Sequence, residues 1–316
     1  SLVALLDAPP VESEKASVFV VVGASGEKEY AEVFAASAAG WEKAAVAGDA
    51  ALTKIGQDRP GEKPDRDLLR AALESESKTQ GGPLWLAFIG HGTHDGKTAK
   101  FNLRGPDVSG AQLAEWLQPF QRPVVVVNCA SSSGPFLNRL AGPRRVVVTA
   151  TKSGHEVNYA RFGKFFAETL ADPAADLDKD GQASLLETYL IASRRVQDFY
   201  ESEGRLATEQ ALLDDNGDGL GTPASWFIGL RAAKKAKGGA KTDGARAHQL
   251  HLVPSEFERR IPADLRVLRN QWEQDVADLR DQKSQHAEDD YYALLEPLLV
   301  KLARLHQRID QAVKTP

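Results

Sequence analysis

Methionine is absent from this 316-residue sequence, and cysteine occurs only once, at position 129. A single cysteine excludes an intrachain disulfide, although it neither indicates nor excludes an oxidising compartment. No apolar run approaches the roughly 20 residues that a membrane-spanning helix needs, so we expect no membrane span. An excess of positive charge is also missing. The net charge of −5 gives no basis for binding nucleic acid or an anionic membrane.

The missing methionine also bears on processing. A primary translation product begins with methionine, so we expect that an upstream segment was removed, and a secretory signal is one candidate. Residues Leu2–Leu6 are either the remainder of an apolar segment or the start of a helix. An extracytoplasmic location is slightly favoured over a cytoplasmic one, and the sequence leaves the oligomeric state open.

Short apolar runs rich in valine alternate with amphipathic segments over most of the chain, which predicts an α/β fold. Continuous rather than alternating valines are typical of strands covered on both faces by helices. The predicted strands are Val18–Gly26, Leu84–Gly92, Pro123–Gly134 and Arg144–Gly154, with a weaker one at Ala50–Gly56. The predicted helices are Glu29–Ala47, Asp65–Ser77, Ser109–Leu117, Phe136–Leu140, Asn158–Ala171 and Ser184–Tyr200. We therefore expect a three-layer sandwich with a mainly parallel sheet.

The C-terminal part has a different character. Residues 232–250 are rich in lysine, alanine and glycine, which is typical of a flexible linker. Residues 251–316 are highly charged and carry leucines at helical spacing, which predicts a helical hairpin. The expected organisation is an N-terminal segment (1–16), a main domain (17–231), the linker, and the helical region.

Three predicted strands end in small or polar residues. Parallel sheets present their ligand sites at the carboxyl ends of the strands, so these ends should converge. His91 and Gly92 end one strand, and Asn128 and Cys129 end the next. A histidine beside a thiol is what a cysteine nucleophile requires, because the imidazole helps to form the thiolate and then protonates the leaving amine. The amides of Gly92 and Cys129 are candidates for an oxyanion hole.

A lone cysteine on a valine-rich strand is more often a small buried hydrophobic residue than a nucleophile. Its place after the apolar run, directly before Ser-Ser-Ser-Gly, favours the catalytic interpretation. The third strand end supplies Thr151 and Ser153 as candidate substrate-binding residues, together with Asn128.

A strand ending in His-Gly, followed by one ending in cysteine before small residues, resembles the caspase–legumain clan of cysteine peptidases. The segments around Tyr30 (YAEVF after VVVGASGEKE) and at Glu156–Ala160 (EVNYA) are most similar to the legumain branch and its bacterial relatives. The resemblance covers residues 18–227. It implies a caspase-like fold and endopeptidase activity with Cys129 and His91 as the catalytic pair.

The chain departs from the legumain pattern near the first specificity pocket. Ala31 follows Tyr30 where legumains carry an arginine, and Glu29 stands in place of an asparagine. Asn128 also precedes Cys129, where legumains have an acidic residue before alanine–cysteine. Without that arginine, a preference for Asp or Asn is in doubt. Glu29 and Glu156 are candidates to bind a basic side chain, and both are equally well read as solvated carboxylates. A basic preference would make Lys234–Lys241 a self-cleavage site.

Residues 176–187 have the side-chain pattern of an EF-hand calcium loop. Carboxylates occupy loop positions 1, 3 and 5, a glycine follows at position 6, and a glutamate closes the loop at position 12. The expected Ca²⁺ ligands are Asp176, Asp178, Asp180, Gln182 through its carbonyl, Ser184 and Glu187. Acidic turns before helices also occur without an ion, since carboxylates favour helix N-termini. No organic cofactor is expected.

Two other metal readings remain open. Residues 214–219 repeat the first half of a calcium loop, but Pro223 and Ser225 follow, so this is a weaker site or an Asx-rich turn. The sequence His91-Gly-Thr-His94-Asp95 is an alternative zinc-binding motif. The other histidines lack a spacing that would complete such a site.

The sequence therefore predicts a caspase-like cysteine endopeptidase that acts on proteins or peptides and is stabilised or regulated by calcium. The alternative is a caspase-like binding or regulatory module that has lost turnover. The C-terminal helices resemble a legumain prodomain in position, and are read either as an inhibitory segment, as a docking module, or as a hairpin packed permanently on the main domain.

Overall fold

The computed structural model describes residues 15–58, 61–239 and 241–314. Its centre is a seven-stranded sheet with the strand order β10-β9-β8-β7-β3-β1-β2. The strands of this sheet are β1 (Ser17–Val22), β2 (Ala51–Ile55), β3 (Leu84–Ile89), β7 (Val124–Asn128), β8 (Arg145–Thr149), β9 (Leu212–Asp214) and β10 (Thr222–Pro223). The N-terminal segment predicted at 1–16 lies outside the described residues except for its last two.

The valine-rich runs form the inner strands because their side chains are buried on both faces. All six residues of β1 and of β3 are buried, as are all five of β7. Strands β2, β1, β3, β7 and β8 pair in parallel, and only β9 and β10 add antiparallel pairs at one edge. A small separate antiparallel sheet follows β3 and consists of β4 (Gly92–His94), β5 (Ala99–Phe101) and β6 (Val108–Ser109).

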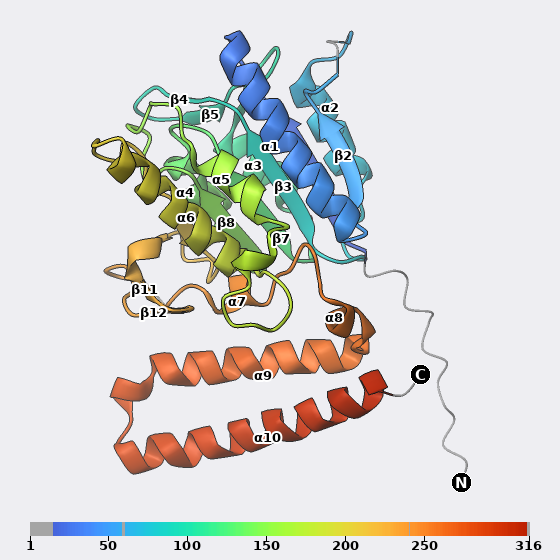
Figure 1. Cartoon of the computed structure of the whole chain (residues 1–316), viewed down its shortest axis with the longest axis vertical. Helices are drawn as coiled ribbons and strands as arrows, with labels where there is room; N and C mark the ends of the chain where they lie inside the picture. The colour runs from blue at the N-terminus through green and yellow to red at the C-terminus, as the bar shows by residue number, and fades with distance from the viewer. Residues whose placement is uncertain (1–14, 59–60, 240, 315–316) are drawn as a thin grey trace.

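Helices cover both faces of the sheet (Figure 1). One face packs against α1 (Lys28–Ala47), α5 (Phe162–Thr169) and α6 (Leu185–Ser202), and the other against α2 (Asp65–Ser75), α3 (Gly110–Leu117) and α4 (Gly134–Leu140). Two of these helices begin at capping boxes, Ser109 with Gln112 and Ser184 with Glu187, which satisfy the free amides of the first turn. The predicted three-layer α/β sandwich with a mainly parallel sheet is confirmed.

The predicted linker differs from the structure in its second half. Asp243 is only 4% exposed and Ala247 is fully buried, and the segment contains the helix α7 (Ala245–His248). The strand pair β11 (Phe227–Ile228) and β12 (Arg231–Ala232) lies directly before the segment, which begins at the last residue of β12. Lysine and glycine content predicted flexibility, but the buried Asp243 accepts hydrogen bonds from the amides of Asp215 and Asn216 and fixes the segment on the main domain.

The C-terminal region forms the predicted helical hairpin. A short helix, α8 (Glu256–Arg260), leads into α9 (Ala263–Asp281), and α10 (Glu288–Lys314) returns along it. The two long helices share a small core of their own, formed by Ile261, Leu265, Leu305, Ile309 and Val313. Figure 1 places the hairpin at the end of the molecule opposite β4, near the amino ends of the strands. Within the described ranges, none of the helices combines the length and apolarity needed to cross a bilayer.

Candidate active site

Cys129 and His91 lie at the carboxyl ends of neighbouring strands. Strands β3 and β7 pair in parallel with Phe88 opposite Asn128, so His91 and Cys129 follow the same edge of the sheet. Both side chains are on the face covered by α1 and α5: Cys129 belongs to the core cluster that contains Phe34, and the His91 ring lies 5.1 Å from the Phe34 ring. The arrangement that the sequence required, two strand ends side by side with the reactive groups on one face, is present.

The Cys129 side chain is buried beneath the start of α5. Only 4% of the residue is exposed, and its side chain packs so closely against Gly163 that a Cβ there would lie 2.4 Å from the Cys129 Cβ. Burial, together with the negative charge of Glu209, raises the pKa of the Cys129 thiol to about 12. The thiol is therefore protonated at neutral pH in this arrangement, and a thiolate needs a change in its surroundings.

Glu209 is a site residue that the sequence did not reveal. Its carboxylate is 5% exposed and accepts hydrogen bonds from the amides of Arg161 and Phe162, at 2.9 and 3.0 Å, at the N-terminus of α5. The Tyr200 hydroxyl also donates to it, at 3.2 Å. Burial raises the pKa of this carboxyl, and these donors offset part of the rise. Glu209 thus occupies the helix N-terminus that would otherwise favour a thiolate at Cys129.

His91 is surrounded by aromatic rings. The ring centroids of Tyr30 and Tyr159 lie 4.6 and 6.2 Å from that of the imidazole. Burial lowers the pKa of His91, while the Ser25 backbone acts in the opposite direction. A lowered pKa favours the neutral imidazole, whose unprotonated nitrogen is the proton acceptor that a general base requires.

The two candidate catalytic groups are neighbours without being bonded. In the described part of the chain, no hydrogen bond joins the Cys129 sulfur to His91, and Tyr159 lies near both. The expected oxyanion-hole amides are also engaged: the Cys129 amide donates to the Phe88 carbonyl at 2.9 Å, and the Gly92 amide donates to the Ser131 hydroxyl at 3.2 Å. Those two amides do not point at a common vacant position in this arrangement.

Two of the candidate substrate-binding residues are internal. Asn128 and Thr151 are fully buried. Because side chains alternate along a strand, Asn128 faces away from Cys129, and its side-chain oxygen accepts from the Ala130 amide at 3.1 Å. The Thr151 hydroxyl accepts from the Gly134 amide at 3.0 Å and contacts the Ser133 hydroxyl at 3.2 Å. Both residues shape the Ser-Ser-Ser-Gly loop after Cys129, and neither is placed to contact a substrate.

The other candidates lie nearer the surface. Ser153 is half-buried, and its hydroxyl accepts from the His155 amide at 3.3 Å. The Glu156 carboxylate accepts from the amides of Lys152 and Gln210, at 2.8 and 3.3 Å, so it is committed to internal bonds. Glu29 is exposed and lines a hollow of about 270 Å³ with Tyr30 and Tyr159, the two tyrosines that hold His91.

That hollow also contains positive charge that the sequence did not single out. Arg161 and Arg205 line it, and the Arg161 guanidinium lies over the Phe199 ring at 4.1 Å. Arg161 directly precedes α5, the helix that covers Cys129, and its side chain lines the hollow. No motif marks either arginine in the sequence, because the helix and the loop that carry them meet only in the folded chain.

The acidic turn at residues 176–187 folds around its own carboxylates. Asp176, at loop position 1, accepts from the amides of Asp180 and Gly181 at 3.1 Å. Asp176, Asp178 and Asp180 offer oxygen atoms within 4.8 Å of one another. Glu187, at position 12, is 1% exposed and accepts from the Ser184 amide and hydroxyl, both at 2.8 Å, and from the Leu177 amide at 2.7 Å.

The turn at residues 214–219 has the same backbone pattern as the first half of this loop. Positions 4 and 6 have positive φ in both turns: Lys179 (65°) and Gly181 (92°) in one, Gly217 (82°) and Gly219 (77°) in the other. In each turn the position-1 carboxylate accepts from the position-6 amide, at 3.1 Å in the first and 2.8 Å in the second. The second turn then continues into β10 instead of a helix.

The alternative zinc motif receives no support from the geometry. Over the ranges that the structure describes, the clusters of three or more possible metal ligands are Asp176–Asp178–Asp180 and Asp178–Glu187–His248, and neither includes His91 or His94. His94 instead packs against the ring of His155, with ring centroids 5.7 Å apart.

Comparisons with known proteins give structural similarity only. No family model matches this sequence, and no curated protein sequence matches it. The initiator caspase Dronc of Drosophila is 14% identical with a TM-score of 0.43, covering 70% of this chain and 95% of Dronc. Caspase-1 of Spodoptera frugiperda is 11% identical with a TM-score of 0.42, covering 68% and 93%. Protein GSU0716 of Geobacter sulfurreducens is 14% identical with a TM-score of 0.37, covering 57% and 89%. Because these TM-scores are below 0.5, the similarities carry no argument about this chain.

Proposed function

We propose that this protein is a caspase-like cysteine peptidase, with Cys129 as nucleophile and His91 as general acid and base. The observation that carries the proposal is the placement of Cys129 and His91 at the ends of adjacent parallel strands on the same face of the sheet. The lowered pKa of His91 supports it, because burial favours the neutral imidazole, which can accept the thiol proton.

The reaction is an acyl transfer. His91 takes the proton from the Cys129 thiol, and the sulfur attacks the carbonyl carbon of the scissile peptide bond. The protonated His91 then gives its proton to the leaving amine, which departs and leaves a thioester. Water, deprotonated by His91, hydrolyses the thioester and restores the thiol. The first step requires the Cys129 side chain to leave its contact with Gly163, because the buried thiol does not ionise at neutral pH.

A second candidate function is a binding module that keeps the fold without turnover. The observation that favours it is the closed state of the thiol, which is buried, protonated and not bonded to His91. Retention of both Cys129 and His91 on the same face favours the enzyme.

A panel of fluorogenic peptides separates the two functions. Peptides with Arg, Lys, Asn, Asp or Gly before the scissile bond are incubated with the full chain, with and without Ca²⁺. The peptidase proposal expects turnover of at least one peptide that is lost in Cys129→Ala and in His91→Ala. Labelling of Cys129 by a thiol-reactive inhibitor in the wild type, but not in His91→Ala, gives the same assignment without a known substrate. If no peptide is turned over and labelling of Cys129 does not depend on His91, the peptidase proposal is wrong and the binding module is the remaining function.

We also propose that the turn at residues 176–187 binds Ca²⁺. Carboxylate and carbonyl oxygens are the ligands that this hard cation prefers, and Asp176, Asp178 and Asp180 already converge. Ser184, the Gln182 carbonyl and Glu187 would complete the set. The Glu187 carboxylate caps α6 in this structure, so it would exchange some of its bonds to the Ser184 amide and hydroxyl for a bond to the ion.

If the enzyme prefers a basic residue before the scissile bond, we propose that it cuts its own chain within Lys234–Lys241. Mass spectrometry of the purified wild type and of Cys129→Ala tests it directly: a cut in this segment should occur only in the wild type. An uncut segment in both proteins would contradict it. The hairpin itself does not cover the catalytic residues, since it packs at the opposite end of the sheet (Figure 1). Occlusion of the active site by these helices is therefore not part of the proposal.

A further inference from the structure

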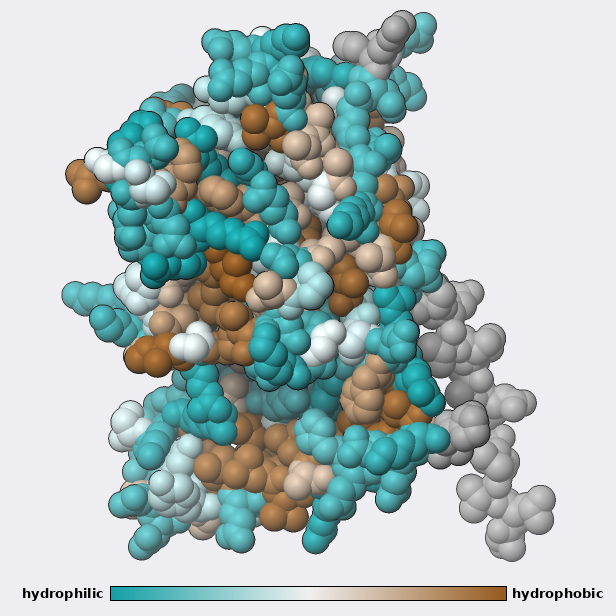
Figure 2. All heavy atoms as spheres, in the orientation of Figure 1, coloured by the Kyte–Doolittle hydropathy of each residue, from teal (hydrophilic) through white to brown (hydrophobic). Residues whose placement is uncertain are grey.

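A cavity separates the main domain from the helical hairpin. Its volume is about 780 Å³, and its walls come from the β12 strand, the segment around α7, the helix α9 and the first half of α10. In the space-filling view, the surface is hollowed between the body and the hairpin, and apolar residues gather over the hairpin (Figure 2). No part of this cavity belongs to the Cys129–His91 site.

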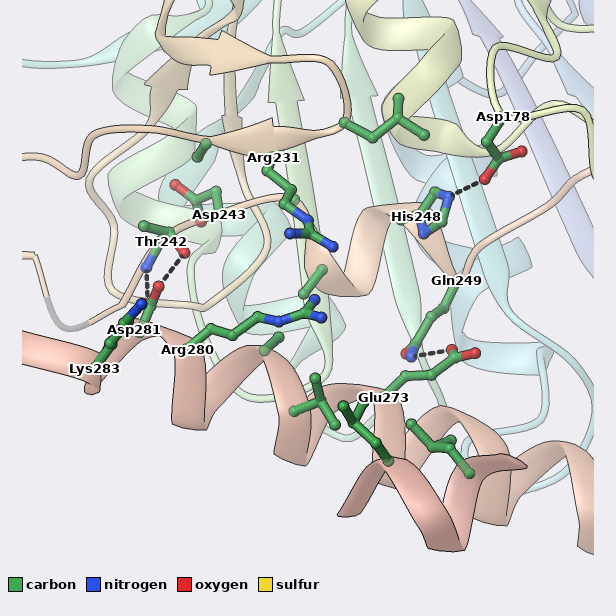
Figure 3. Close-up of a pocket in the computed structure, with 18 of the residues that line it drawn as sticks. Asp178, Arg231, Thr242, Asp243, His248, Gln249, Glu273, Arg280, Asp281 and Lys283 are labelled. Carbon is green, nitrogen blue, oxygen red and sulfur yellow. Dashed lines mark hydrogen bonds and ion pairs between the residues drawn. The ribbon is translucent and has the colours of Figure 1, made fainter. Parts of the chain in front are cut away.

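Two guanidinium groups, one from each side, project into this cavity. Arg231 comes from β12 of the main domain and Arg280 from the last turn of α9, and their side chains point toward one another (Figure 3). Burial and the positive charge of Arg231 lower the pKa of Arg280, and the Tyr291 side chain acts in the opposite direction. The approach of two like charges is unfavourable unless an anion lies between them.

Four carboxylates also line the cavity, and each is hydrogen-bonded to a group other than these two arginines. Asp281 accepts from the Thr242 amide and hydroxyl at 2.6 and 2.7 Å, and Asp243 accepts from the Thr222 hydroxyl at 2.6 Å. Glu273 accepts from the Gln249 side chain at 3.0 Å. Asp178 is bonded to His248 at 2.9 Å. In the described ranges neither guanidinium forms an ion pair with a carboxylate, whereas every one of these acids has a donor.

The rest of the lining adds a third cation and an apolar surface. Lys283 also faces the cavity, and its ammonium lies 5.2 Å from the centre of the Tyr291 ring. Leu230, Val276 and Leu299 supply apolar contacts beside the charged groups. A planar guanidinium group can bind two oxygens of a phosphate or a carboxylate group at once, through paired charge-assisted hydrogen bonds.

We propose that this cavity binds a small organic anion, with its phosphate or carboxylate group between Arg231 and Arg280 and its apolar part against Leu230, Val276 and Leu299. Such a ligand bridges the main domain and the hairpin, and it strengthens the packing of one on the other. The proposal is independent of peptidase activity, because the site lies at the opposite end of the sheet from Cys129.

The test is calorimetric titration of the full chain with phenyl phosphate, benzoate and inorganic phosphate at constant ionic strength. Saturable binding of phenyl phosphate or benzoate is expected, and the tighter of the two identifies the anionic group. Weaker binding of inorganic phosphate than of phenyl phosphate would assign a role to the apolar surface. Arg231→Gln and Arg280→Gln should each weaken binding about ten-fold or more, which is the loss expected for a charged hydrogen bond.

The matched control is Arg304→Gln, which removes an exposed arginine from α10 outside the cavity. It should bind the probes within about two-fold of the wild type, because exposed charges are well screened. Without ligand, Arg231→Gln and Arg280→Gln should not lower the melting temperature, because each removes the repulsion between the two guanidinium groups. Absence of saturable binding by all three probes would overturn the proposal. So would unchanged binding by Arg231→Gln and Arg280→Gln, or an equal loss in Arg304→Gln.

Discussion

Gly163 and Glu209 control the surroundings of the only cysteine. The absence of a side chain at Gly163 lets α5 lie directly on Cys129, and Glu209 caps the same helix through the Arg161 and Phe162 amides. A glycine at the second position of a helix is unremarkable in a sequence, and so is a glutamate in a loop. Their importance arises in the folded chain, where Gly163 packs against the Cys129 side chain and the charge of Glu209 acts on the thiol.

Gly163→Ala should destabilise the protein by about 1–3 kcal/mol, because the new methyl group would overlap the Cys129 side chain in a packed core. Denaturant unfolding followed by tryptophan fluorescence measures the change. Gly61→Ala is the control, since a Cβ at Gly61 would have no neighbour within 4 Å. Equal stability of Gly163→Ala and the wild type would show that Cys129 is not held in this contact.

Glu209→Gln should increase the rate at which iodoacetamide labels native Cys129 at pH 8. The negative charge of Glu209 contributes to the raised pKa of the thiol, so removing it increases the thiolate fraction, while burial keeps the rate below that of the unfolded protein. Glu168→Gln, on the exposed side of α5, is the matched control. A rate unchanged by Glu209→Gln would contradict the electrostatic effect.

The turns and helices show how short segments fix one another. The Asp176 and Asp214 turns adopt the same backbone pattern, although one leads into α6 and the other into β10. The buried Asp243 binds the second turn through the Asp215 and Asn216 amides. Each turn is thus closed by its own carboxylates and anchored by a residue from a different segment.

Asp176→Asn should abolish a calcium-dependent rise in melting temperature, because the first position of a calcium loop takes aspartate, whereas positions 3 and 5 also take asparagine. A ligand that binds only the folded state stabilises it by about 2.7 kcal/mol when its concentration is 100 times its Kd. The resulting rise in melting temperature is measurable by scanning fluorimetry. Asp198→Asn, on the exposed face of α6, should keep the wild-type response. A wild type whose melting temperature does not change with Ca²⁺ would remove the calcium proposal.

Asp243→Asn should flatten the dependence of stability on pH. Burial, followed by the charge of Asp215, raises the pKa of Asp243 to about 8, whereas an unfolded aspartate has a pKa of about 3.9. The folded state therefore holds this proton more tightly, and its contribution is complete below about pH 4 and is lost as the pH rises toward 8. Urea unfolding at pH 5, 6, 7 and 8 measures the slope. An identical slope in wild type and variant would show that Asp243 is ionised in the folded state.

At the scale of the whole molecule, the Cys129–His91 pair and the hairpin occupy opposite ends of the sheet. The Arg259 side chain donates to the Ala47 carbonyl, which precedes the amino end of β2, whereas His91 and Cys129 follow the carboxyl ends of β3 and β7. The hairpin is anchored by Asp281, which binds the amide and hydroxyl of Thr242. Loss of these anchors should therefore lower the free energy of unfolding and leave the surroundings of the Cys129 thiol unchanged.

Asp281→Ala should lower the free energy of unfolding by about 1–3 kcal/mol, since it leaves a donor of Thr242 without its partner. The iodoacetamide labelling rate of native Cys129 should remain at the wild-type value. Asp310→Ala, on an exposed part of α10, controls for the loss of a charge from the hairpin. A large change in the labelling rate of Asp281→Ala would show that the hairpin acts on the surroundings of Cys129.

The sequence by itself determined the layers of the fold and the placement of Cys129 and His91 at one edge of the sheet. Valine-rich runs are long enough to identify buried strands, and parallel strands bring their carboxyl ends to one edge. The acidic loop was also recognisable, because its carboxylates are close together in the chain. These features depend on local pattern and on general rules of sheet geometry.

Only the tertiary structure decided which neighbours each of these groups has. Glu209 reaches Cys129, and Asp243 fixes a segment that its composition predicted to be flexible, because residues distant in the chain exclude water from both carboxyls. Asn128 and Thr151 proved internal for the same reason. The arginines of the cavity meet only when the hairpin packs against the main domain. Burial and charge at these points depend on long-range contacts, which no local pattern in the sequence encodes.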